Sequence, residues 1–399
     1  MPELAQKQKV KKVRNPLFHI ARRNEVPTWF VFVVKLSFIL GALLLCGIIS
    51  FLVSPITLDE MPEKFISYYI FVVEGTFFNM NTAFSTLWNA SLLLIIAAAI
   101  TPAFKMKFWN IGAEGQVLMG CFGAAIVMKF IAPSIPNFLS LILMLALALI
   151  FAAAWAAIPA IFKAFFNTNE TLFTLMMNYI AIGLVAAFSL KFKATGSTAL
   201  GVLNAGTHAG WMPEIFGSSY LIGIFVIINL VVALWFYLKY SKHGYEIAVL
   251  NGSVRTAEYV GINVKVVTIR TMILCGAVCG IAGFLLVSGS SHTVSETVVG
   301  GRGFTAVMIS WLGHFNPLEM VLYSVLNAII TVGSSNAAAN LQYSGEVANV
   351  LSGLFFLLIL TSEFFTNFRI RFNLRQFFKS KNEPPMSEGQ TPKAEGGKQ

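Results

Sequence analysis

The stretch WFVFVVKLSFILGALLLCGIISFLV, residues 29–53, contains Lys35 as its only charged side chain. As an α-helix, a stretch of this length rises about 37 Å, which exceeds the roughly 30 Å of hydrocarbon in a bilayer. The stretch is too long for the core of a signal peptide and lacks a small-residue cleavage site. We therefore expect an uncleaved membrane-spanning helix here.

Blocks of the same kind recur along the chain, which has 56% hydrophobic and only 12% charged residues, about half the charged fraction of soluble domains. The stretch 304–312 is apolar but too short to cross a bilayer alone, and we count it as a short, re-entrant segment. The pattern predicts an all-α polytopic integral membrane protein with about ten membrane segments. The further full spans are expected at residues 87–104, 108–131, 138–162, 172–190, 220–237, 266–287, 318–332 and 350–365.

Basic residues gather at both ends of the chain, before the first apolar block and after the last one. Lysine and arginine mark the cytoplasmic side of membrane spans, so both termini are expected to be cytoplasmic. Topology and attraction to anionic membrane lipid explain these clusters, and no nucleic-acid partner is expected. The terminal basic residues are Lys7, Lys9, Lys11, Lys12, Arg14, Arg22 and Arg23, then Arg369, Arg371, Arg375, Lys379, Lys381, Lys393 and Lys398.

The loops between the spans follow the same rule. Eight basic residues fall in loops or span ends that this topology places inside, and five fall on or near the outer side. The inner group comprises Lys105, Lys107, Lys163, Lys239, Lys242, Arg255, Lys265 and Arg270, and the outer group comprises Lys64, Lys129, Lys191, Lys193 and Arg302.

A polar motif, Phe-Trp-Asn-Ile-Gly-Ala-Glu-Gly-Gln at residues 108–116, opens the third expected span. Glu114 follows Lys107 by seven residues, about 10 Å along a helix, which places its carboxylate within or near the hydrocarbon. A carboxylate at that depth should face protein or a wet cavity. Asn110, Glu114 and Gln116 either line a substrate path or lock helices together by hydrogen bonds, and the residues alone leave both readings open.

Two further segments carry polar side chains. Asn169 is expected to cap the fifth span, while Asn178, deeper in that span, is assigned to the path. In the loop 243–262, residues 253–260 are predicted to form a short amphipathic helix with Val254, Ala257 and Tyr259 toward an apolar surface. This helix either docks on a cytoplasmic partner or lies on the membrane.

No catalytic constellation is visible in the sequence. Asp59 is the only aspartate, and no phosphate-binding loop or cluster of metal-ligating side chains appears. The four cysteines all lie inside apolar blocks and are expected to pack rather than to bind metal. We therefore expect no enzyme, no cofactor and no metal site, and any ATP hydrolysis that drives transport must occur on another polypeptide.

Five motifs, in order and spacing, resemble one known family. They lie at residues 108–116, 169–180, 243–246, 257–262 and 301–304. Together they resemble the permease subunits of nucleoside and simple-sugar ABC importers, in the branched-chain amino acid/ribose permease superfamily. The resemblance covers about residues 87–372, and it implies three partners: cytoplasmic ABC ATPase subunits, a second permease, homologous or identical, and an extracytoplasmic substrate-binding (lipo)protein.

The charge pattern gives the two tails of the chain, and the resemblance implies the coupling loop between them. A basic cytoplasmic tail, 1–28, precedes a transmembrane permease domain, 29–368, which contains a cytoplasmic coupling loop, 239–265; a basic, partly disordered tail, 369–399, follows. The protein is expected in the bacterial cell (inner) membrane. Residues implied in coupling to the ATPase are Gly244, Tyr245, Glu246, Arg255, Glu258, Tyr259 and Gly261.

The substrate implied by the resemblance is nucleoside-like, with a simple sugar or riboflavin as alternatives. The loop departs from the family where the usual Gly-Leu-Asn-Pro is replaced by Val-Leu-Asn-Gly-Ser at residues 249–253. A stand-alone secondary transporter or channel is a competing hypothesis, but it predicts ion-coupling acids in the spans, where Glu114 is the only clear deep carboxylate. A membrane-embedded enzyme is the third hypothesis, and no catalytic group set supports it.

Overall fold

The computed structural model of the chain describes residues 18–23, 26–53, 61–193, 197, 200–342 and 344–372. Most of the two predicted tails, together with Asp59, lies outside these residues. The chain divides into two compact units, one formed by residues 44–356 and the other by residues 1–43 with 357–399.

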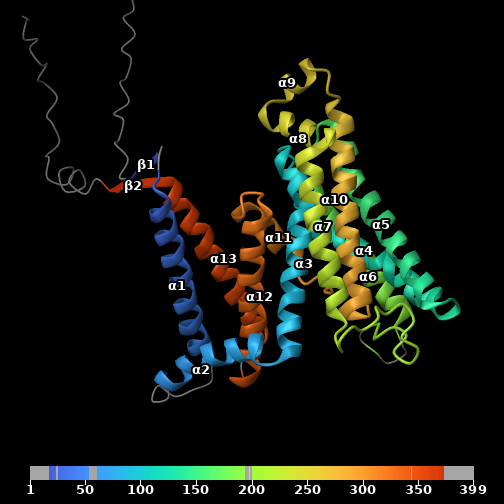
Figure 1. Ribbon diagram of the computed structural model, residues 1–399, viewed down its shortest axis with the longest axis horizontal. Coiled ribbons are helices and arrows are strands. Elements are labelled where there is room, and N and C mark those ends of the chain that lie inside the picture. Colours follow the sequence, from blue (N-terminus) through green and yellow to red (C-terminus); the bar gives the residue numbers. More distant parts are fainter. Residues whose placement is uncertain are drawn as a thin grey trace, which may run out of the picture. The chain divides into compact units, whose positions relative to one another are not determined.

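Helices make up nearly all of the described chain, and two short strands, one before the first helix in the chain and one after the last, pair with each other (Figure 1). In chain order the elements are β1 (Phe18–Arg22), α1 (Thr28–Val53), α2 (Met61–Val73), α3 (Met80–Lys105), α4 (Ala113–Phe130), α5 (Asn137–Phe166), α6 (Glu170–Phe192), α7 (Tyr220–Tyr240), α8 (Lys242–Gly252), α9 (Val254–Tyr259), α10 (Val264–Leu286), α11 (Arg302–Leu312), α12 (Pro317–Asn340), α13 (Glu346–Asn367) and β2 (Phe368–Phe372).

Nine of the described helices are long and apolar enough to cross a membrane, namely α1, α3, α4, α5, α6, α7, α10, α12 and α13. The short helix α11 has 11 residues and therefore rises only about 16 Å. The predicted all-α polytopic fold with nine full spans is confirmed, and the shorter apolar helix among the described residues is Phe65–Phe78.

The core of the unit 44–356 is built where α4, α5 and α10 pack through small residues. A methyl group on Gly276 or Gly280 would overlap the carbonyl oxygen of Ala152 or Ala148, respectively, at 2.5 and 2.6 Å. These backbones therefore approach one another more closely than larger side chains allow, the usual device of membrane helices. Cys275 is fully buried beside this seam.

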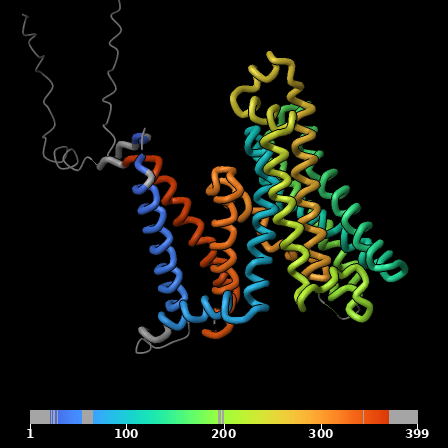
Figure 2. Tube along the Cα trace, in the orientation of Figure 1, coloured from blue at the N-terminus to red at the C-terminus, as the bar shows by residue number. Residues whose placement is uncertain are grey.

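The connections between consecutive spans from α3 to α6 are short, so these spans alternate in direction, as the chain trace shows (Figure 2). The ends of α3, α5 and α7 and the start of α10 lie at one end of this unit, where α8 packs against α3, α7 and α10 (Figure 1). The segment 200–219 lies at the opposite end, before α7. We call the first of these ends the α8–α9 end.

In the other unit, β1 and β2 form an antiparallel ribbon that pairs Phe18 with Phe372 and Arg22 with Phe368. The helices that adjoin the ribbon are linked by an ion pair between Lys35 and Glu363, at 3.3 Å. The ribbon is the one sheet among the described residues, and the sequence pattern of the ends does not predict it.

Candidate functional site

The link between α3 and α4 is irregular, although the sequence pattern predicts helix from Phe108 onward. α3 ends at Lys105, Lys107 adopts a left-handed backbone with φ 62°, and the amide of Phe108 returns to the carbonyl of Ala103 at 2.9 Å. Helix resumes only at Ala113. The predicted start of this span is therefore wrong, and so is the 10 Å depth for Glu114 that assumed a continuous helix.

Side chains supply the hydrogen bonds that this non-helical backbone lacks. Asn110 accepts from the amide of Gly112 at 3.0 Å and from the side chain of Gln116 at 3.2 Å. From α6, Thr174 accepts from the amide of Ile111 at 3.2 Å. Irregular backbone among membrane helices is tolerated only where protein or cavity water satisfies it, and these side chains do so.

Asn178, in the middle of α6, adds two more hydrogen bonds to the same link. We call residues 110–116, together with Thr174 and Asn178, the clamp. The side-chain oxygen of Asn178 accepts from the amide of Gly115 at 2.9 Å, and its amide group donates to the carbonyl of Ile111 at 3.0 Å. A methyl group on Gly115 would lie 2.8 Å from the Asn178 oxygen, so glycine there permits the approach. The clamp is buried, with Asn110 fully inaccessible and Asn178 1% exposed.

Asn169, at the start of the same helix, accepts from the amide of Leu172 at 3.1 Å. The predicted cap of this span is confirmed.

The Glu114 carboxylate bridges two helices. One oxygen accepts from the amide of Gly301 at 2.8 Å and the other from the amide of Gly303 at 2.6 Å. Gly301 is the N-cap residue of α11 and has no side chain with which to cap it, so Glu114 serves as the cap from a distant part of the chain. Glu114 also lies in the first turn of α4, and one negative charge thus meets the positive ends of two helices.

Arg302 extends this cluster to a third helix. Its guanidinium donates to the side-chain oxygen of Asn89 on α3 at 2.9 Å and to the carbonyl of Val299 at 2.9 Å. It also lies close enough to Glu114 for their charges to interact. Neither Asn89 nor Arg302 is assigned a site role from the sequence, although Arg302 falls inside the 301–304 motif.

Two polar atoms of the clamp are left over. The side-chain nitrogen of Asn110 and the side-chain oxygen of Gln116 are buried and have no hydrogen-bond partner among the described residues. An unsatisfied buried donor or acceptor costs about 1–3 kcal/mol. The spare donor and the spare acceptor therefore belong to two side chains that are already joined to each other by a hydrogen bond.

The second candidate region is the α8–α9 end. α8 is a helix that the sequence pattern does not predict, and it is fixed by His243, whose ring contacts the hydroxyls of Tyr237 at 3.0 Å and Thr271 at 2.9 Å. Because the Thr271 hydroxyl donates to the carbonyl of Val267 at 2.7 Å, it accepts from His243 Nε2, and His243 Nδ1 accepts from Tyr237. The ring thus joins α7, α8 and α10.

The residues implied in coupling differ in their surroundings. Glu246 forms an ion pair with Arg270 at 3.3 Å, and Gly261 has a left-handed backbone, φ 80°, where α9 ends. Gly244 packs directly on the end of α7. Tyr245, Arg255, Glu258 and Tyr259 are exposed.

The short helix predicted at 253–260 forms as α9, but its predicted buried face is only partly right. Ala257 is fully buried, whereas Val254 and Tyr259 are 51% and 92% exposed. α9 has only six residues, and Ala257 packs into an apolar cluster with Met106 and Ile247. A helix of this length presents one inward position, and the larger side chains are left outside.

The buried imidazole of His243 predicts a pH dependence of stability. Burial, and then the Arg270 charge, lower the pKa of His243, while Glu246 and the carbonyl of Val267 oppose the shift. In the unfolded chain the pKa of this histidine is near 6.5. As the pH falls, the unfolded chain therefore binds a proton at a higher pH than the folded chain does. The contribution of neutral His243 to the free energy of unfolding is complete above about pH 6.5. It is lost as the pH falls toward the lowered pKa of the folded protein.

We expect the melting temperature of the wild-type protein to fall in this window and that of His243→Gln to fall less, because glutamine does not titrate. Melting curves of both proteins from pH 7.5 to 5 test this. Parallel pH profiles would contradict it.

Known proteins share this sequence organisation. A family described as branched-chain amino acid transport system / permease component matches residues 82–360. A glucose ABC transporter permease protein of Haloferax volcanii is 26% identical over 360 residues, covering 87% of this chain and 92% of its own length. A guanosine ABC transporter permease protein of Bacillus subtilis is 26% identical, covering 73% and 88%. A nucleoside ABC transporter permease protein of Lactococcus lactis is 27% identical, covering 62% and 71%.

The family match spans most of the chain and contains both candidate regions, the clamp around Glu114 and the α8–α9 end. The chain belongs to the family of branched-chain amino acid transport system permease components, as the membrane-spanning permease subunit of an ABC importer.

Proposed function

We propose that this permease forms the translocation path for a nucleoside-like substrate. The observation that carries the proposal is the buried polar clamp at residues 110–116, in the Asn-Ile-Gly-Ala-Glu-Gly-Gln form that resembles the nucleoside branch of the superfamily. Relatives named for guanosine and nucleosides support it, and a relative named for glucose makes a simple sugar the alternative.

The path is proposed to run beside Asn110, Glu114, Gln116 and Asn178. The spare donor of Asn110 and the spare acceptor of Gln116 support this, because nucleobase edges and ribose hydroxyls offer the complementary groups. In the present conformation Glu114 and Asn178 bind backbone amides, so their proposed task is to hold the wall of the path.

The α8–α9 end is proposed to face the cytoplasm and to dock on the ATPase subunit. Lys105, Lys163, Lys239 and Lys265 gather at this end, in agreement with the distribution of basic residues on cytoplasmic sides. Both termini would then be cytoplasmic, in a bacterial inner membrane. The assembly would include a second permease, homologous or identical, and an extracytoplasmic binding (lipo)protein that delivers the substrate.

Substrate identity is tested by uptake into cells with and without this permease. We expect its deletion to abolish uptake of labelled adenosine or guanosine and to leave that of glucose and riboflavin unchanged. Loss of glucose or riboflavin uptake with intact nucleoside uptake would overturn the nucleoside assignment and leave the permease role standing.

The exposed ring of Tyr259, at 92%, is where coupling is expected to be most sensitive. Tyrosine at the centre of an interface often contributes 2 kcal/mol or more, so Tyr259→Ala should lower the transport-coupled ATPase rate about tenfold or more. The rate is measured in proteoliposomes containing the whole transporter. Tyr179→Ala is the matched control, since Tyr179 is also exposed, at 62%, but lies on α6; equal rates for both variants would contradict the docking role.

A further inference from the structure

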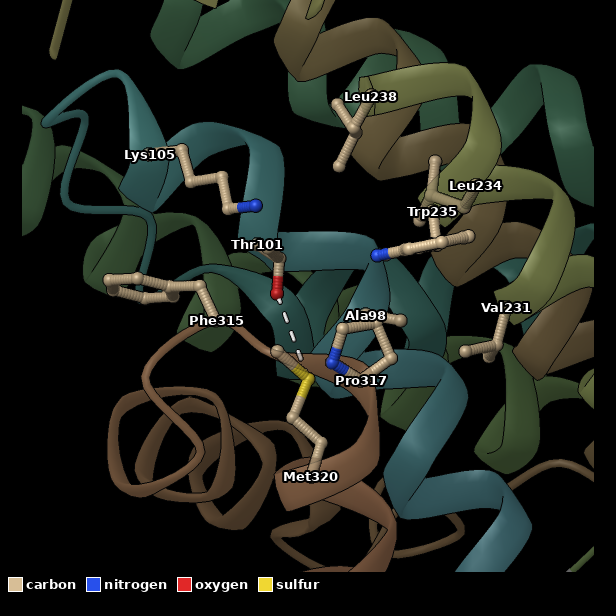
Figure 3. A pocket seen from close by; sticks show the side chains of 10 residues that line it. All are labelled: Ala98, Thr101, Lys105, Val231, Leu234, Trp235, Leu238, Phe315, Pro317 and Met320. Carbon is tan, nitrogen blue, oxygen red and sulfur yellow. Dashed lines mark hydrogen bonds between the residues drawn. The ribbon is translucent and has the colours of Figure 1, made fainter. Parts of the chain in front are cut away.

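A small cleft opens between α3, α7 and the turn that joins α11 to α12 (Figure 3). It is partly open, with about 270 Å³ of empty space in it and at its mouth taken together, and its wall is mostly apolar. The cleft is separate from the clamp around Glu114, with which it shares no residue. Its lining comprises Ala98, Thr101, Lys105, Val231, Leu234, Trp235, Leu238, Phe315, Pro317 and Met320.

The polar groups that face this cleft are hydrogen-bond donors. The ammonium group of Lys105 lies near Thr101, and the indole nitrogen of Trp235 is turned toward the centre of the cleft (Figure 3). The Thr101 hydroxyl is already engaged by the carbonyl of Ala97 at 2.9 Å and by Ser310 at 3.1 Å. Neither the Lys105 nor the Trp235 donor has a hydrogen-bond partner among the described residues, so both are available to a ligand with acceptor oxygens.

A second cation lies next to the Trp235 side chain. The ammonium of Lys239 lies over the Trp235 ring, 4.8 Å from its centroid. The acidic group nearest in sequence to the lining, Glu319, is engaged by His314 at 3.0 Å on the α11–α12 side. The α3–α7 side of the cleft is therefore positively charged, and a half-buried ammonium such as that of Lys105 favours an anion in its neighbourhood.

The cleft lies at the ends of two spans, where phospholipid headgroups are expected to meet hydrocarbon. Lys105 is the last residue of α3, and Trp235 and Lys239 lie in the last turns of α7. Tryptophan and lysine concentrate at this level in membrane proteins. One turn and two turns before Trp235 on the same helix, Val232 and Ile228 are 47% and 51% exposed, which provides an apolar track for an acyl chain.

We propose that this cleft binds one anionic phospholipid, with its phosphate between Lys105 and Trp235 and an acyl chain along the outer face of α7. Basic pockets between membrane helices bind such headgroups elsewhere. The lipid would bridge α3, α7 and the α11–α12 turn. It would thereby tie the short helix α11, whose other end is capped by Glu114, to the two spans beneath the α8–α9 end.

The proposal is tested by native mass spectrometry of the full-length permease with its copurifying subunits, in detergent containing equal amounts of phosphatidylglycerol and phosphatidylcholine. We expect the wild-type protein to retain one phosphatidylglycerol per permease. Lys105→Met should reduce this retention about five- to tenfold. Lys107→Met removes the same charge from an exposed position at the same membrane level, outside the cleft lining, and should leave retention unchanged.

A second variant distinguishes the loss of a hydrogen-bond donor from a disruption of the fold. Trp235→Phe keeps an aromatic ring but removes the N–H, and should also weaken phosphatidylglycerol retention. Equal retention in the wild-type protein and both cleft variants would overturn the proposal. So would equal retention of phosphatidylcholine, or full displacement by soluble glycerol phosphate, which would identify a free-phosphate site. Loss of a second permease copy in Lys105→Met without loss of lipid would identify a protein interface instead.

Discussion

Glu114→Ala should abolish uptake and markedly lower the melting temperature of the purified transporter. The substitution removes both oxygens that accept from the amides of Gly301 and Gly303. Each buried amide left without a partner costs about 1–3 kcal/mol, and the loss of a negative charge at a helix N-terminus adds to this. The free energy required to open the contact between α4 and α11 should thus fall by about 2–6 kcal/mol.

Glu170→Ala is the matched control for this substitution. Glu170 is also a glutamate in the first turn of a span, α6, but its carboxylate forms a partly exposed ion pair with Lys163 at 2.8 Å. Such pairs contribute about 0–1 kcal/mol. Glu114→Gln, which keeps one acceptor oxygen, should be intermediate. If Glu114→Ala melts within error of Glu170→Ala, the carboxylate does not hold α11.

Gly244→Ala should reduce transport at least tenfold. The added methyl group would overlap the backbone carbonyl of Leu238 at the end of α7, and a backbone group cannot rotate aside as a side chain does. Overpacking of this kind costs about 1–3 kcal/mol or more, and the cheapest relief is a shift of α8 away from α7. Uptake and ATP hydrolysis by the reconstituted transporter measure the effect.

Gly252→Ala tests whether the effect comes from the contact itself. Gly252 lies at the other end of the same helix, α8, and a methyl group there meets no atom within 4 Å. Alanine is a better helix former than glycine, so this variant should transport normally. If both alanine variants transport equally, the close approach at Gly244 is not required for coupling.

The spans were predictable because a bilayer fixes the length of an apolar helix, and because caps such as Asn169 act within three residues of their own position. The short segment at α11 was predictable from its length. These properties are local, and each can be recognised in a window shorter than a span.

The start of α4 was not predictable in this way. Phe108 and Trp109 have the apolar character of a span, and two of the side chains that replace the missing helical bonds come from α6, 63 and 67 residues away. The partners of Glu114 lie 187 and 189 residues along the chain. Sequence pattern therefore identified Glu114 and Asn178 as unusual but could not say what they bind.

The roles of His243 and of α9 depended on tertiary packing as well. A lone histidine in a loop motif does not reveal that its two nitrogens contact hydroxyls on two different spans. In α9, helical periodicity favoured three inward residues, whereas Ala257 is the one of the three that is buried in the apolar cluster beneath it.

The burial of the native thiols has a practical consequence. Cys46, Cys121, Cys275 and Cys279 are all unpaired and at most 1% exposed, so water-soluble maleimides should leave the folded wild-type protein unlabelled. The natural chain can thus serve as its own background for site-directed spectroscopy. A single cysteine introduced at position 259 or 179 would carry a fluorophore or spin label without prior removal of the native cysteines, three of which lie on α4 and α10, the helices of the small-residue seam.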